Sequence, residues 1–317
     1  MREERERDEV NSVFEQPWWL DAVAPGRWRE LIVSGKNAEC LGRMVYAEEK
    51  LFGIPYIGMP PLTQQMGPWI ALHPNLKYVK ALHKTKAVLD AMIAQIGEQK
   101  NVDLVFHNSF QYIVPFVWNG YRVIPEVSYV IEDLSNIDLV YNGMEAKLRN
   151  LIKNAREKYS VEDNIGCDDL ILLLESTFAK QGRKSPLSRQ LIQRIYDVSA
   201  EHQARKILGA RDKETGKLVA AAFFLYDQHT CYYLLGGKDY SRKTDGSQEL
   251  LIWEGIRFAA SVSREFDFEG SMVPGIEQFF RGFGGRPRIY FRVRKGGCIF
   301  MFLHWVKPYI KKILGYK

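Results

Sequence analysis

Residues 266–285, FDFEGSMVPGIEQFFRGFGG, hold the side chains best placed to do chemistry. Asp267 and Glu269 alternate with two phenylalanines, so in a strand the two acids share one face. A carboxylate at a strand end can take the proton that an attacking ammonium must lose. Arg281 lies between aromatic residues and three glycines, where a cation can contact an oxyanion or a phosphate. We predict that Glu269 and Arg281 are catalytic, with a salt bridge and the capping of carbonyls as their alternative roles.

Two further groups of residues suit an anionic ligand. Gly246 and Ser247 stand where a predicted strand gives way to a helix, and backbone N–H groups at a helix start bind anions. Arg149, Lys153 and Arg156 are spaced by four and three residues, so they form one basic stripe on a helix. The alternatives are an ordinary N-cap for the serine and a solvated flank for the stripe. We predict that Arg149, Lys153, Gly246 and Ser247 bind the donor or the substrate.

Tyr232 and Tyr233 lie on opposite faces of a predicted strand. One of them can donate a proton to a thiolate or ribose leaving group, and we predict Tyr233 as a substrate-binding residue, with a place in the aromatic core as the alternative. The sequence has no Walker loop, H-E-x-x-H or G-x-S-x-G motif, and its 6 histidines show no ligand spacing. We therefore predict no metal and no covalent nucleophile. Transfer would be a direct attack in a ternary complex.

Two successive α/β halves position these residues. The first half has strands over 28–57, a helix over 76–99, a strand over 102–107 and a strand pair over 120–131 that Pro125 breaks. The second half opens at Asn142, because Glu145 follows at the capping-box spacing. Its remaining predicted elements are helices over 168–181, 188–203, 248–260 and 275–280 and strands over 206–211, 218–226, 231–235, 265–268 and 289–294. This order is α+β with a mixed sheet.

Composition sets the broad class of the protein. The chain has 317 residues, is 46% hydrophobic and carries a formal charge of +6, which permits an anionic partner without requiring one. Its 4 cysteines form no C-x-x-C pair, so free thiols in a reducing compartment are expected. The first residues, MREERERDEV, are too charged for a signal peptide, and no apolar run is long enough to span a membrane. A cytoplasmic location is expected.

Several segments together resemble the FemAB-like branch of the GNAT acyltransferase superfamily. They are QPWWLDA, PPLTQQMGPW, SYVIEDL followed by KLRNLIKNARE, TFAKQG, YYLLGG and the 266–285 block, and they cover residues 14–295 in order. The resemblance implies two tandem GNAT-like domains, each a mixed, mostly antiparallel sheet flanked by helices. We expect them at 1–139 and 140–298, followed by a tail at 299–317. The segment 242–247, RKTDGS, departs from the usual phosphate loop because Asp245 and Ser247 replace small residues.

The resemblance also implies an activity. Family members transfer an acyl or aminoacyl group from acyl-CoA or aminoacyl-tRNA to an amine, without a tightly bound cofactor. The expected acceptor is an amine of a cell-envelope precursor or a nucleotide sugar, with tRNA as a possible partner and no DNA. The apolar and basic tail suits peripheral contact with the inner face of the membrane, or docking on the fold. The alternative function is a non-catalytic binding or scaffold protein with a degenerate donor site.

Overall fold

Two compact units make up the chain. The computed structural model describes residues 6–97, 101–241, 245–270 and 272–313. Residues 1–126 and 289–317 form the first unit, and residues 127–288 form the second. The chain crosses between the units within strands β6 (Arg122–Ile131) and β12 (Arg286–Lys295). The predicted boundary after residue 139 therefore lies inside the second unit, and the predicted tail lies in the first.

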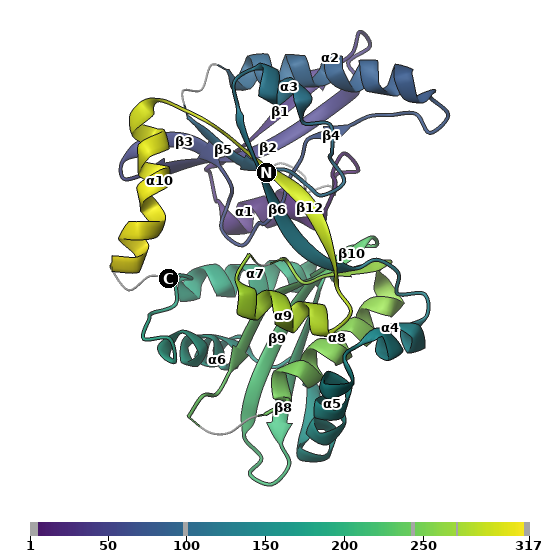
Figure 1. Cartoon of the computed structure of the whole chain (residues 1–317), viewed down its shortest axis with the longest axis vertical. Coiled ribbons are helices and arrows are strands. Elements are labelled where there is room, and N and C mark those ends of the chain that lie inside the picture. The colour runs from purple at the N-terminus through teal and green to yellow at the C-terminus, as the bar shows by residue number, and fades with distance from the viewer. Residues whose placement is uncertain (1–5, 98–100, 242–244, 271, 314–317) are drawn as a thin grey trace. The chain divides into compact units, whose positions relative to one another are not determined.

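The first unit is built on a sheet in the order β1-β2-β3-β5-β12, with β6 beside β12. The β3–β5 pair is parallel, whereas β1–β2, β2–β3 and β5–β12 are antiparallel. Besides β6 and β12, its elements are η1 (Val13–Glu15), α1 (Pro17–Val23), β1 (Trp28–Ser34), β2 (Cys40–Leu51), β3 (Ile54–Gly58), β4 (Trp69–Ile70), α2 (Tyr78–Ile96), β5 (Val102–Val105), α3 (Val114–Trp118) and α10 (Cys298–Ile313) (Figure 1).

Helix α2 covers this sheet because its apolar residues recur every three or four positions. Val88, Leu89, Met92, Ile93 and Ile96 are all buried against residues of β1, β2, β3 and β5. This spacing places them on one face of the helix, and the polar residues face solvent. The sequence-based prediction of this helix is confirmed in kind and position.

The second unit holds a sheet in the order β6-β11-β10-β9-β8-β7. Every residue from 219 to 225 in β9 is fully buried, because helices α6 and α8 both pack against that strand (Figure 1). The elements of this unit are α4 (Ile137–Gly143), α5 (Ala146–Lys158), β7 (Tyr159–Asp163), α6 (Cys167–Ala179), α7 (Arg189–Glu201), β8 (Arg205–Asp212), β9 (Leu218–Tyr226), β10 (Thr230–Lys238), α8 (Ser247–Val262), β11 (Glu265–Asp267) and α9 (Pro274–Gly282).

The α+β class with a mixed sheet is confirmed, whereas two local predictions are wrong and one strand was missed. Pro125 breaks no strand, because β6 runs through it; the fixed φ of proline suits extended backbone and only an N–H is lost. Asn142 opens no helix, since it lies in the last turn of α4, whose N-cap is Asn136. The sequence analysis also missed β7, which pairs with β8 over its whole length.

Candidate active site

The two central strands of the second unit separate along one edge. Strand β10 pairs in parallel with β11 only at residues 230–232, because β11 ends at Asp267 while β10 continues to Lys238. On its other edge, β10 pairs with β9, and the register shifts between Tyr233 and Leu235. A shift of this kind is a β-bulge, which twists and bends the strand. Beyond Tyr232, β10 therefore presents an edge that β11 does not cover.

A cavity of about 380 Å³ opens beside this edge. Its walls come from β10, the first turn of α8, helix α9 and helix α6. The lining residues are Thr177, Tyr233, Gly236, Gly237, Lys238, Tyr240, Gln248, Glu249, Gly275, Ile276 and Phe279. Of the residues predicted as sites, Tyr233 alone is among them.

Tyr233 is held by Gln248 on the facing helix. The Gln248 amide Nε2 donates to the Tyr233 hydroxyl at 2.9 Å and to the Ala221 carbonyl at 3.1 Å. The tyrosine oxygen accepts in this contact, so its own proton is available to a group in the cavity. Burial raises the pKa of Tyr233 above its ordinary 10, so the phenol is protonated at neutral pH. Tyr232, by contrast, is buried in the core.

Two adjacent glycines of β10 serve different packing needs. A Cβ on Gly236 would overlap the Tyr233 hydroxyl, so glycine leaves room for that side chain. A Cβ on Gly237 would lie 2.6 Å from main-chain atoms of Leu173 and Leu174 in α6. The first glycine therefore serves the cavity, and the second lets helix and strand approach.

The start of α8 is packed against α5. Gly246 is the N-cap with a left-handed φ of 78°, and a Cβ there would lie 3.0 Å from Ala155 and 3.1 Å from the Leu151 carbonyl. Helix packing therefore accounts for this glycine. Ser247 is fully buried as the first residue of α8. Residues 242–244 of the predicted phosphate loop lie outside the described residues.

Asp267 and Glu269 form a buried acidic pair at the end of β11. Ser128 and the Glu269 N–H, the latter at 2.7 Å, both donate to Asp267 Oδ1. Burial raises the pKa of Asp267 to about 6. Glu269 has a left-handed φ of 60°, and its Oε1 is enclosed without a hydrogen-bond partner in the described part of the chain. Burial, and then the Asp267 charge, raise the pKa of Glu269 well above its ordinary value, so the carboxyl keeps its proton at neutral pH.

The predicted basic residues lie apart from the cavity. Arg281 is exposed on α9 and pairs with Glu277 at 3.0 Å. Arg149 donates to the carbonyls of Asn142 at 2.6 Å and Met144 at 3.0 Å, so it closes the C-terminal end of α4. Lys153 is exposed on α5. The structure therefore does not bring these three side chains together with Tyr233 at the cavity.

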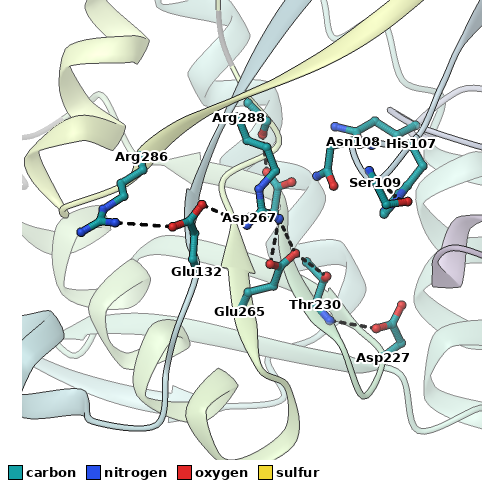
Figure 2. A network of polar contacts seen from close by, with 12 residues as sticks. His107, Asn108, Ser109, Glu132, Asp227, Thr230, Glu265, Asp267, Arg286 and Arg288 are labelled. Carbon is teal, nitrogen blue, oxygen red and sulfur yellow. Dashed lines mark hydrogen bonds and ion pairs between the residues drawn. The ribbon is translucent and has the colours of Figure 1, made fainter. Parts of the chain in front are cut away.

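An ion network holds β10 and β11 together where the two strands pair, at residues 230–232 and 265–267 (Figure 2). Arg288 Nη1 lies 2.8 and 2.9 Å from the two Glu265 oxygens, and the Thr230 hydroxyl donates to Glu265 at 2.9 Å. Glu132 joins Arg288 at 3.4 Å and Arg286 at 3.5 Å. Thr230 and Glu265 face each other in the parallel ladder, so the network locks the register from which the strands diverge.

The sequence analysis missed Gln248 and Glu249, which it treated only as the start of a helix. The doubled glycine of YYLLGG was a usable signal, because glycine inside a strand often marks a close approach. Within the described ranges, no group of three or more His, Cys, Asp or Glu side chains is arranged to hold a metal ion. All four cysteines are free thiols.

Comparison with known families assigns most of the second unit to a domain family. Residues 143–281 match the model of the acetyltransferase (GNAT) domain. Residues 143–281 therefore form a GNAT acyltransferase domain. The cavity of this GNAT acyltransferase lies within the matched residues. A search of curated proteins gives no match to the chain.

Solved structures extend the likeness to the whole fold. FemX superposes with a TM-score of 0.68 at 12% identity, over 89% of this chain and 92% of that one. A lysylphosphatidylglycerol synthetase C-terminal domain from Agrobacterium fabrum gives 0.55 at 12% identity, over 87% and 88%. A tandem GNAT protein from the clavulanic acid pathway gives 0.51 at 13% identity, over 86% and 83%. At these identities the likeness shows the tandem GNAT fold.

Proposed function

We propose that this GNAT acyltransferase moves an acyl or aminoacyl group from an acyl-CoA or an aminoacyl-tRNA to the amine of a cell-envelope precursor or an amino sugar. The observation that carries the proposal is the cavity beside the open edge of β10, which lies in the GNAT domain and contains the protonated Tyr233 hydroxyl. A cavity of about 380 Å³ is large enough for the reacting ends of two substrates, but not for a whole donor.

The lining residues suit direct transfer. The amine nitrogen forms a bond to the donor carbonyl carbon, and the bond from that carbon to sulfur or oxygen breaks. Tyr233 gives its proton to the departing thiolate or ribose oxygen, and the proton lost by the nitrogen returns to the phenol through solvent. Gln248 holds the Tyr233 phenol in place throughout, so the phenol need not move during the reaction.

The other predicted residues keep narrower roles in the proposal. Gly246 and Ser247 begin α8, whose N-terminal end favours the negative charge of a donor. Lys153 and Arg281 are exposed cations, suited to anionic parts of a substrate outside the cavity. Glu269 can act as a base only after losing its proton, so a role in catalysis would make activity rise with pH above neutrality.

Replacing Tyr233 with phenylalanine tests the assignment. Wild type and Tyr233→Phe are assayed with acyl-CoA and charged-tRNA donors against amino sugars and lipid-linked amines. We expect kcat to fall roughly 10²- to 10⁴-fold, because the proton donor is lost. Tyr196→Phe is the control, since it removes a structural hydrogen bond to the Ile165 carbonyl away from the cavity. If the wild type turns over none of these donors, the proposed function is refuted. Full activity of Tyr233→Phe would refute the role of Tyr233.

We also propose that the protein works in the cytoplasm and contacts anionic lipid through α10. Phe300 is buried on one face of this helix, where its ring lies 5.4 Å from that of Tyr56. Ile299, Phe302 and Trp305 are 69%, 57% and 62% exposed. The sequence of the tail at 299–317 also carries four lysines, which suit an anionic surface. No helix among the described residues is long and apolar enough to cross a membrane.

Vesicle co-sedimentation tests this contact. We expect binding to vesicles that contain phosphatidylglycerol, and a roughly tenfold loss in Trp305→Ser because a large apolar side chain no longer enters the interface. Trp118→Ser is the matched control, since Trp118 is 64% exposed in the same unit on a different helix. Equal binding by both variants, or none by the wild type, would refute the contact.

A further inference from the structure

The turn between β2 and β3 contains a residue that its backbone shape does not favour. Leu51 pairs with Ile54, so two residues, Phe52 and Gly53, close the hairpin. Their φ angles are 48° and 86°, both in the left-handed region, as a type I′ turn requires. The usual sequence of such a turn is Asn-Gly, because asparagine tolerates left-handed backbone. A bulky residue such as phenylalanine is strained there.

The fold makes no use of the Phe52 ring. This residue is 61% exposed, and its ring makes no aromatic or cation–π contact within the described part of the chain. A Cβ on Gly53 would meet no atom within 4 Å, so the tip of the hairpin lies open. Because packing does not account for a strained and exposed phenylalanine, its place at the tip points to a function outside the fold.

The charged side chains next to the turn leave a positive surplus. Glu48 pairs with Arg29 at 2.9 Å, and Glu49 pairs with Arg27 at 2.5 Å. Lys50, the next residue along β2, is exposed and forms no ion pair with any described residue. The two carboxylates are therefore neutralised, whereas the ammonium is not. An apolar tip beside a free cation suits an anionic lipid surface.

Helix α10 lies beside β3, the strand that follows the turn (Figure 1). The rings of Phe300 and His304 lie 5.4 and 6.0 Å from that of Tyr56 in β3. Three residues of strand separate Tyr56 from the turn, a span of roughly 10 Å in extended backbone. The hairpin tip and the helix already proposed to contact lipid are thus neighbouring parts of the first unit.

We propose that the β2–β3 turn inserts Phe52 into the headgroup region of an anionic membrane, beside α10. The ring enters the apolar boundary of the bilayer, and Lys50 adds attraction to the lipid phosphates. The inference rests on the lipid contact proposed for α10 and adds a second anchor to it. Two anchors on one unit bind more tightly than either alone, because the second attaches within an existing complex.

The variant Phe52→Asn tests this role, because it should change binding and stability in opposite directions. Co-sedimentation of the full-length protein with vesicles that contain phosphatidylglycerol should show roughly tenfold weaker binding, since a large apolar side chain is lost. The midpoint of urea unfolding should rise, because asparagine suits the turn. Phe52→Leu should keep most of the binding. Tyr78→Asn is the control, since this tyrosine is 77% exposed on α2 of the same unit.

Each outcome decides for or against the inference. Wild-type binding by Phe52→Asn overturns it, and so does a lower urea midpoint, which would show that the ring supports the fold. A dimer in sedimentation velocity that Phe52→Asn dissociates would also overturn it, because a second copy would then cover the tip. If Trp305→Ser loses binding and Phe52→Asn does not, the α10 contact stands without the turn; the reverse result would keep the turn and remove α10.

Discussion

Glu15 makes the stability of the first unit depend on pH. The side chain is fully buried, and its Oε1 accepts hydrogen bonds from the Gly67 N–H at 2.8 Å and from Asn11 at 2.9 Å. Its other oxygen has no partner in the described part of the chain. Burial raises the pKa of Glu15 from its ordinary 4.5 to about 6, although those hydrogen bonds and the Arg43 charge oppose the shift.

The raised pKa of Glu15 determines whether its contribution to stability rises or falls with pH. The folded protein binds this proton more tightly than the unfolded chain, so the contribution of Glu15 is fully present below about pH 4.5. It is lost as the pH rises through about 6, and the loss then reaches about 2 kcal/mol. Most partnered carboxylates behave in the opposite way, since their pKa values fall on folding.

The perturbation is Glu15→Gln, which keeps the accepting oxygen and removes the charge. We expect the variant to gain about 2 kcal/mol relative to wild type between about pH 4 and pH 8. Urea unfolding of the full chain, followed by tryptophan fluorescence at several pH values, gives the two free energies of unfolding. Other titrating groups cancel in their difference. Glu39→Gln, at an exposed position, is the control.

A difference between wild type and Glu15→Gln that stays constant from pH 4 to pH 8 would refute the reasoning. It would mean that the carboxyl titrates alike in the folded and unfolded states. A change in the opposite direction would show that Arg43, which is fully buried and lies 3.0 Å from Glu30, dominates the electrostatics of Glu15.

Three further replacements probe the second unit. Gly237→Ala should lower the free energy of unfolding by about 1–3 kcal/mol in a denaturant titration, because its Cβ meets α6 backbone that must shift. Gly236→Ala should cost less stability but reduce turnover as Tyr233→Phe does, since its Cβ meets the side-chain ends of Tyr233 and Gln248 rather than backbone; wild-type activity would contradict this. Arg281→Ala should change stability by under about 0.5 kcal/mol, because its ion pair is exposed, and should raise KM. An unchanged KM would remove Arg281 from the site.

Most elements of the second unit after β7 can be predicted from sequence, because their periodicities and turn glycines are local signals. The helix that begins at Ser247 and the strand around Tyr233 are both found this way. Pro125 and Asn142 misled the prediction, since each has a second context in which it fits. Proline tolerates extended backbone, and asparagine also occurs in the last turn of a helix.

The site was harder to predict because it depends on where strands stop. Glu249 resembles any acid in the first turn of a helix, and only the end of β11 at Asp267 leaves the cavity that this residue lines. Arg149 carries the positive charge expected of a residue that binds phosphate. Because it lies beside the end of α4, however, it donates hydrogen bonds to carbonyls there. Long-range geometry of this kind leaves no trace in residue spacing.

The split of the first unit between both ends of the chain has a consequence for biosynthesis. Strand β5 pairs with β12, whose residues 292–295 leave the ribosome long after residues 102–105. The second unit is one continuous segment, 127–288, so it can fold while the first still lacks its closing strand. A chain truncated after residue 288 and released from the ribosome should contain a protease-resistant second unit beside a first unit that remains open to cleavage.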